Sequence, residues 1–164
     1  MRTAVSAAFA AAALLLSAAP AGAIPVIYNV PLDPVQEVDG IGTPNQGEPG
    51  ASGLATLTLD AATDSISWSI SVAGLTMPLS GAHIHQAPAG VNGGVVIDFS
   101  AALVGGPIVD ADVDAVLANP TGYYVNLHNS VRPGGAIRGQ IPEPGTLGLF
   151  AAALGGLALL RRSA

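Results

Sequence analysis

Two neighbouring runs of alternating apolar and polar residues constrain the fold more than any other feature of this chain. Side chains on a β-strand point to opposite faces in turn, so such alternation predicts antiparallel strands with one buried and one solvated face. A turn-forming segment, Asp60–Asp64, separates the two runs. Serines and threonines fill the positions between the apolar residues, which are Ala55, Leu57, Leu59, Ile66, Trp68, Ile70 and Val72. Trp68 falls in the apolar phase, and we expect it to pack in the core rather than to stack on a ligand.

Further strands and one short helix are expected along residues 24–141. The helix is predicted to begin after Asp110 or Asp112 as its cap, because Val113, Val116 and Leu117 recur at helical spacing and a proline follows. The acidic run before it does not fit a calcium-binding EF-hand loop, which requires glycine and glutamate where Ala115 and Thr121 stand. The further strands are expected at Ile24–Val30, His83–His85, Val95–Phe99, Tyr123–His128 and Ala136–Ile141. The predicted fold class is all-β: an antiparallel β-sandwich, immunoglobulin-like or superoxide-dismutase-like, with one short helix.

The two ends of the chain carry the features of export and anchoring segments. Residues 1–23 combine Arg2, an apolar run and an Ala-Gly-Ala site, which together predict a removed signal peptide; a retained N-terminal anchor is the alternative. Residues 145–160 carry no charge and are followed by Arg161 and Arg162, which predicts a short C-terminal transmembrane helix with its arginines in the cytoplasm. The predicted organisation is a signal peptide at 1–23, a β-sandwich domain at 24–141 and a C-terminal signal at 142–164.

Charge and cysteine content exclude several function classes. Residues 24–141 contain two arginines against ten acidic residues, and the chain has no lysine, so nucleic acid is not an expected partner. The chain also has no cysteine, which excludes disulfides, thiol catalysis and cysteine-ligated zinc. The sequence shows no nucleophile elbow, paired-carboxylate motif or phosphate-binding loop, and we therefore expect a non-catalytic protein.

The only three histidines of the chain, His83, His85 and His128, are the candidate site residues. His83 and His85 lie at i and i+2 of a predicted strand, so both rings project from one face. If the strand ending in His128 lies beside it, three imidazoles could share one copper or zinc ion, with Asn126 and Tyr124 as neighbouring residues around the site. The alternative is that each imidazole is a structural hydrogen-bonding residue of the sheet.

These residues also carry a family resemblance. The segments Ala82–His85, Gly90–Gly93, Tyr124–Asn129 and Pro133–Ile141 resemble the CHRD domain, named from chordin, an extracellular inhibitor of bone morphogenetic proteins. The resemblance covers roughly residues 29–141, and it departs from the family pattern at Asn129, usually threonine, and at Ala136, usually glutamate. It implies a secreted β-sandwich module, and it does not name a molecular activity. The pair His83-Ile84-His85 also resembles the copper strand of copper/zinc superoxide dismutases, but those enzymes use six histidines and a disulfide.

A second resemblance lies at the C-terminus. Pro142-Glu143-Pro144, an apolar segment and Arg161-Arg162 look like the PEP-CTERM sorting signal of Gram-negative bacteria that make exopolysaccharide. The resemblance implies processing by an exosortase, transient membrane association and delivery to the cell surface or matrix. Together the features predict an exported binding or structural module with an unidentified protein or exopolysaccharide partner. The alternative is a surface copper- or zinc-binding protein.

Overall fold

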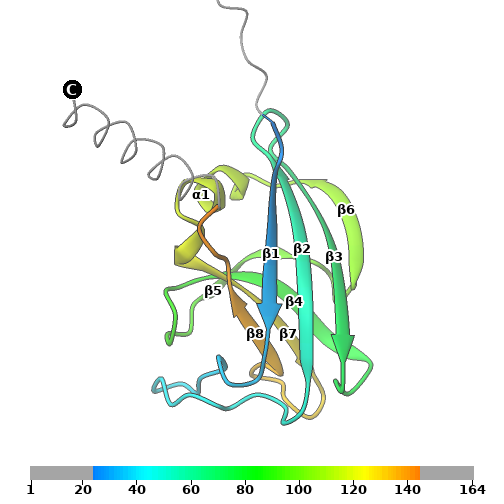
Figure 1. The fold of residues 1–164 in the computed structure, drawn as a ribbon, viewed down its shortest axis with the longest axis vertical. Coiled ribbons are helices and arrows are strands. Elements are labelled where there is room, and N and C mark those ends of the chain that lie inside the picture. The colour runs from blue at the N-terminus through cyan, green and yellow to red at the C-terminus, as the bar shows by residue number, and fades with distance from the viewer. Residues whose placement is uncertain (1–23, 145–164) are drawn as a thin grey trace, which may run out of the picture.

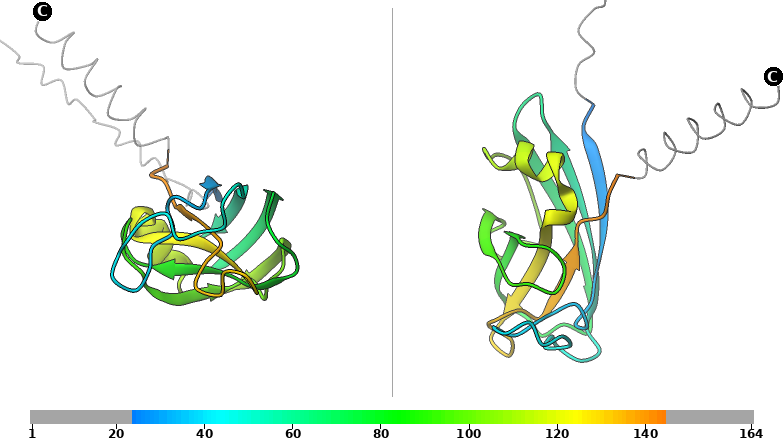
Figure 2. Two further views of the ribbon diagram at one scale, coloured as in Figure 1. Left: turned by 90° about the horizontal axis from the view of Figure 1, so that it is seen from below. Right: turned by 90° about the vertical axis from the view of Figure 1, so that its left-hand side faces the viewer.

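Two four-stranded antiparallel sheets pack face to face in the computed structural model, which describes residues 24–144 (Figures 1 and 2). This confirms the predicted all-β sandwich. The first sheet has the order β1-β2-β3-β6 and the second has the order β5-β4-β7-β8. The strands are β1 (Val26–Leu32), β2 (Ser52–Asp60), β3 (Ser65–Ala73), β4 (Leu79–Gln86), β5 (Gly94–Asp98), β6 (Val104–Val109), β7 (Tyr123–Asn129) and β8 (Ile137–Gln140).

The alternating runs form β2 and β3, the centre of the first sheet. Their register places Leu57 opposite Trp68 and Ala55 opposite Ile70, so all four side chains point into the sandwich. The edge strand β6 was not expected, because its sequence Val-Gly-Gly-Pro-Ile-Val lacks alternation and carries the glycines and proline that usually mark a turn.

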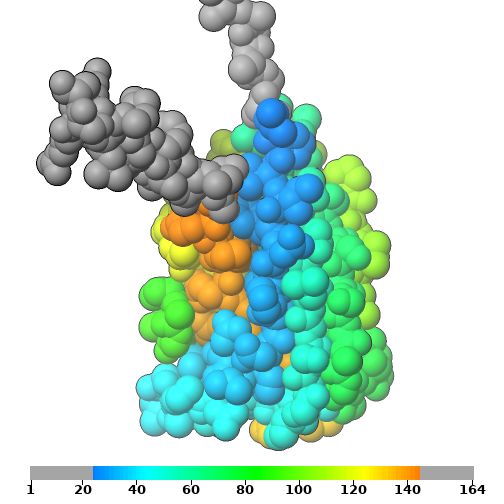
Figure 3. All heavy atoms as spheres, in the orientation of Figure 1, coloured from blue at the N-terminus to red at the C-terminus, as the bar shows by residue number. Residues whose placement is uncertain are grey.

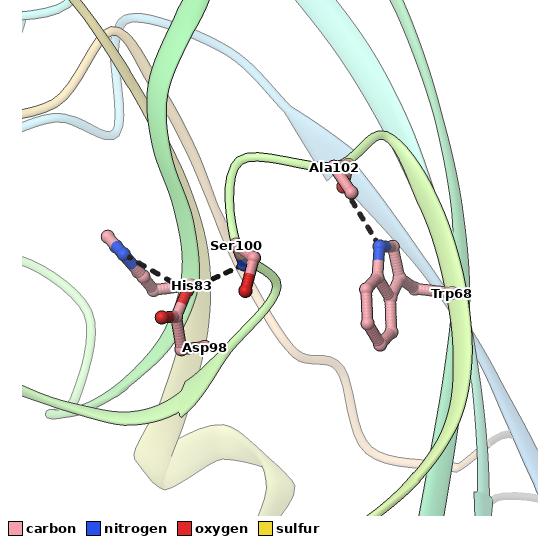
Figure 4. Close-up of polar contacts among 5 residues, drawn as sticks. All are labelled: Trp68, His83, Asp98, Ser100 and Ala102. Carbon is pink, nitrogen blue, oxygen red and sulfur yellow. Dashed lines mark hydrogen bonds and ion pairs between the residues drawn. The ribbon is translucent and has the colours of Figure 1, made fainter.

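The hydrophobic core lies between the sheets and is closed differently on its two sides. On one side, β1 continues toward β8 through two backbone hydrogen bonds of 3.1 Å between Asp33 and Arg138. On the other side, the segment after β5 covers the gap: Phe99 stacks on Trp68 at 4.3 Å between ring centroids. The Trp68 indole donates a 2.9 Å hydrogen bond to the carbonyl of Ala102 (Figure 4). The expectation that Trp68 packs in the core is confirmed, since it is 7% exposed.

The predicted helix is α1 (Val113–Ala118), which is followed by the 3₁₀ turn η1 (Pro120–Gly122). Asp112 is its N-terminal flanking residue, and Val113 and Val116 are fully buried against one end of the core. Across residues 24–144, no helix is long and apolar enough to cross a membrane. The predicted signal peptide and C-terminal transmembrane helix lie outside the residues that the structure describes.

A layer of loops covers the outer face of the second sheet. We call residues 33–51, 87–93 and 130–136 the loop layer. Its three segments are tied together: Asn92 Nδ2 donates to the carbonyls of Val38 and Asp39, and the Glu48 amide donates to the carbonyl of Ala136. Because of this cover, both faces of β7 are mostly buried, and its residues do not alternate in exposure. The loop layer is where the candidate site is built.

Candidate metal centre

The three histidines converge on the outer face of the second sheet, under the edge of the loop layer. In the β4/β7 register, His83 lies opposite Asn126, and His128 lies opposite Gly81. Residues directly opposite one another in an antiparallel pair point to the same face, so His128 is a diagonal neighbour of His83. The ring centroids are 5.1 to 5.6 Å apart, and one nitrogen from each ring lies within 4.8 Å of the other two. The structure therefore brings the three rings together, which the sequence left dependent on the strand order.

Gly81 makes room for this arrangement. A Cβ atom at position 81 would lie 2.5 Å from Cε1 of His83 and 3.5 Å from Cδ2 of His128. The first distance is too short for two carbon atoms, so the His83 ring would have to move. The second distance is an ordinary van der Waals contact. The missing side chain at Gly81 lets the His83 ring lean across the sheet toward His128.

Backbone carbonyls orient two of the rings. Nδ1 of His85 lies 3.0 Å from the carbonyl oxygen of Gly93, and Nδ1 of His128 lies 3.1 Å from that of Pro133. A carbonyl can only accept, so both Nδ1 atoms carry the proton and both Nε2 atoms keep a free lone pair. Each Nε2 is buried and finds no hydrogen-bond partner within residues 24–144.

An acidic side chain faces the third ring. Nε2 of His83 lies 3.6 Å from Oδ1 of Asp98, which also accepts a 2.7 Å hydrogen bond from the Ser100 amide (Figure 4). Asp98 comes from β5 and lies directly opposite His83. The nitrogen left over is Nδ1 of His83, which is also buried and lacks a partner in the described part of the chain.

Burial favours the neutral form of His85 and His128. Desolvation lowers the pKa of His128 to about 4, and the hydrogen bond to Pro133 offsets this only in part. Desolvation also lowers the pKa of His85, and the neighbouring His83 ring adds to the effect. A neutral imidazole keeps the lone pair that a metal ion requires, so these shifts favour ligation over protonation.

This donor set fits copper or zinc. Three imidazole nitrogens are ligands that both ions accept, and a site with three protein ligands retains an open position. In metal sites the second ring nitrogen usually donates to a carbonyl or carboxylate oxygen, which fixes the ring. Here the carbonyls of Gly93 and Pro133 accept such hydrogen bonds from His85 and His128, and a carboxylate oxygen of Asp98 lies 3.6 Å from Nε2 of His83. The three rings therefore offer three ligands, and two of the rings are oriented by hydrogen bonds.

Tyr124 and Asn126, which were predicted to lie around the site, differ in their contacts with the histidines. Tyr124 stacks on His85, with ring centroids 4.9 Å apart and planes 8° apart. Asn126 is 2% exposed, but across residues 24–144 its Oδ1 has no hydrogen-bond partner, and no hydrogen bond joins Asn126 to a histidine. Its role at the site stays a prediction. The sequence reasoning missed Asp98 and Arg138. Pairing the predicted strands at His83–His85 and Val95–Phe99 as a hairpin could have placed Asp98 near His83. The carbonyls that orient the other two rings belong to the backbone, so no residue type in the sequence marks them.

Comparison with known proteins settles the family. A profile of the CHRD domain matches residues 28–141, which is most of the chain and includes all three histidines. The chain belongs to the CHRD domain family. No curated protein and no solved structure matches this CHRD protein.

A second profile, that of the PEP-CTERM protein-sorting motif, matches residues 140–162 of the CHRD protein. The match includes every residue predicted for the sorting signal: Pro142, Glu143, Pro144, Arg161 and Arg162. This motif is a signal for processing by an exosortase, and it implies export and sorting to the cell surface in Gram-negative bacteria.

Proposed function

We propose that this CHRD protein is an exported, non-catalytic surface module that binds one copper or zinc ion through His83, His85 and His128. One observation carries the proposal. His85 and His128 each have one nitrogen hydrogen-bonded to a backbone carbonyl, and one nitrogen of His83 lies 3.6 Å from a carboxylate oxygen. The other nitrogen of each ring is buried and unpaired among the described residues, and one nitrogen from each ring lies within 4.8 Å of the other two.

The alternative is that the imidazoles are purely structural. It explains the ring nitrogens that face oxygen atoms, but not the buried nitrogens that have no partner among the described residues. Structural histidines in a sheet would be expected to satisfy both ring nitrogens or to leave the second one in water. Each buried polar atom without a partner costs roughly 1–3 kcal/mol of stability, and the three nitrogens of this cluster would each add such a cost. A bound metal ion would satisfy all three nitrogens at once, which supports ligation.

The proposal assigns binding without turnover. A redox role would require bound copper and a reactant at its open coordination position, and we propose none. A protein or exopolysaccharide partner in the matrix stays a prediction from the family and the sorting signal. Metal binding and partner binding could both belong to this one domain, because the histidines occupy only one face of one sheet.

Isothermal titration of the full chain in mild detergent with Cu(II) and Zn(II) tests the proposal. We expect one equivalent of either ion to bind, and we expect His83→Ala, His85→Ala and His128→Ala each to lower the affinity at least 100-fold. Asp112→Ala is the control, because it removes a carboxylate from the acidic run before α1 without touching the site. Equal affinity in the wild type and the histidine variants, or loss of binding in Asp112→Ala alone, would overturn the proposal.

A further inference from the structure

A buried arginine lies one aromatic ring beyond the candidate metal centre. Cζ of Arg138 lies 3.4 Å from the centroid of the Tyr124 ring, and the same ring stacks on His85. Tyr124 belongs to β7, which lies between β4 with His85 and β8 with Arg138. The three side chains therefore form a column in the order Arg138, Tyr124, His85, parallel to the sheet.

Neutral groups of the loop layer hold the guanidinium in place. Arg138 is 1% exposed, and its Nη2 donates to the carbonyls of Pro88 and Val91, at 3.2 and 2.8 Å. Its Nη1 donates to Oδ1 of Asn92 at 3.4 Å. A guanidinium stays charged in proteins, so these contacts keep a full positive charge buried beneath the loop.

The same loop orients the metal ligand. Gly93 follows the residues that Arg138 binds, and it makes two contacts: its carbonyl accepts from His85 Nδ1, and its amide donates to the Tyr124 hydroxyl at 3.1 Å. Removing Arg138 would free the segment that fixes both rings of the column. Arg138 thus affects His85 in two ways: it holds the loop that orients the His85 ring, and it places a positive charge near that ring.

The charge has a consequence for the kind of ion that binds. Three neutral imidazoles add no negative charge to the site, so a bound ion keeps its own charge. A fixed cation roughly 9 Å away, estimated from the column spacing and the metal–nitrogen bond length, repels a divalent ion twice as strongly as a monovalent one. We propose that Arg138 is a positioning residue of the three-histidine centre, and that its charge makes the centre prefer monovalent copper, Cu(I), to Zn(II). This inference rests on the proposed metal-binding function.

Two acidic groups could offset the arginine, and neither removes its field. Asp98 faces His83, but its side chain is 62% exposed, so water screens it. Glu37 is 1% exposed, and burial raises its pKa to about 7 although Arg138 acts to lower it. Near neutral pH, Glu37 therefore carries only part of a negative charge.

The test compares two affinities in the full chain at pH 7, where Glu37 is only partly ionised. Cu(I) is titrated without oxygen against a colorimetric Cu(I) chelator, and Zn(II) against a zinc-chelating dye. In Arg138→Gln we expect the ratio of Cu(I) to Zn(II) affinity to fall on the order of ten-fold. A purely structural role would weaken both affinities alike and leave the ratio unchanged.

Three further variants separate charge from structure. Arg138→Lys keeps the charge but loses the planar fork, so both affinities should fall while the ratio stays within about three-fold of the wild type. Glu37→Gln removes a negative charge near Arg138, and it should move the ratio toward Cu(I). Arg132→Gln, with the same substitution in the partly exposed β7–β8 turn, is the matched control, and its ratio should remain that of the wild type.

The outcomes are distinct. Wild-type protein that binds neither ion contradicts the metal-binding function itself. Wild-type binding with an unchanged ratio in Arg138→Gln, or with equal ratio shifts in Arg138→Gln and Arg138→Lys, overturns the charge selection alone. If Arg138→Gln does not fold, Glu37→Gln decides, because a ratio that stays fixed or moves toward Zn(II) contradicts the proposal.

Discussion

The outer faces of the two sheets differ in cover and in chemistry. The first sheet presents serines and threonines to solvent, and across its outer face the Thr56 hydroxyl donates a hydrogen bond to Oδ1 of Asn29. Figure 3 shows β1, β2 and β3 from this side. The second sheet presents Tyr124, Asn126 and Arg138, each only 1% or 2% exposed under the loop layer.

The difference shows how one strand geometry serves two purposes. An outer face in water tolerates small hydroxyls, because water satisfies them. An outer face under loops must have its polar groups satisfied by protein or by a ligand, because burial without a partner is costly. The unpaired imidazole nitrogens are therefore informative on the second sheet and would mean nothing on the first.

The largest expected effect comes from an asparagine at the end of β7. Asn129 is fully buried; its Nδ2 donates to Glu48 Oε2 and the Thr76 carbonyl, and its Oδ1 accepts from the amides of Val131 and Arg132. We expect Asn129→Ala to lower the free energy of unfolding by about 4 kcal/mol. Asn29→Ala on the exposed face is the control and should cost about 0.5 kcal/mol or less. Urea unfolding measures both, and equal costs would remove the contrast between the covered end of the second sheet and the exposed face of the first.

Glu37 should give the second sheet a pH dependence of stability. Burial raises the folded-state pKa of Glu37 from 4.5 to about 7, so the folded state holds a proton that the unfolded state releases between these values. Stability is then fully present below pH 4.5 and falls as the pH rises through 7, by about 3 kcal/mol. Glu37→Gln removes this dependence. The measurement is urea unfolding of both proteins from pH 4.5 to 8 with a chelator present; parallel curves for the two would contradict the assignment.

Two glycines of the second sheet should differ as substitution sites. A Cβ at Gly81 meets the His83 ring, whereas a Cβ at Gly94 meets nothing within 4 Å. We expect Gly81→Ala to displace His83 and to weaken metal binding about 10- to 100-fold, and Gly94→Ala to leave the affinity unchanged. Titration calorimetry checks both variants. Full affinity in Gly81→Ala would show that the position of the His83 ring is not critical.

The smallest effect is expected on the exposed face. Ser69 is exposed in the middle of β3, opposite Thr56 on β2. Ser69→Thr should raise the free energy of unfolding by about 0.3 kcal/mol, because a β-branched side chain suits a strand and packs across it. Thermal and urea unfolding are precise enough to show whether the free energy of unfolding rises or falls. A loss of more than about 1 kcal/mol would mean that this face packs against something in the native protein.

The sequence predicts the first sheet better than the second. The alternation in β2 and β3 determines which side of Trp68 and Ile70 is buried, because one face is wet. In β7, both Tyr124 and Val125 are buried, and the alternation carries no such information. The pairing of His83 and His85 followed from strand periodicity, but the place of His128 beside them depends on the β4/β7 register, which the sequence did not determine. β6 was missed because its glycines and proline are typical of turns.

Two of the atoms that orient the histidines are main-chain carbonyls, at Gly93 and Pro133. Every amino acid carries this group, so the side chain at position 133 can change without loss of the hydrogen bond, provided that the path of the backbone is kept. Position 93 differs, because a Cβ there would lie 1.9 Å from the carbonyl oxygen of Gln86, and only glycine fits. In comparisons among relatives, the glycine at position 93 and the length and shape of the two loops are therefore better markers of the centre than the side chain at position 133.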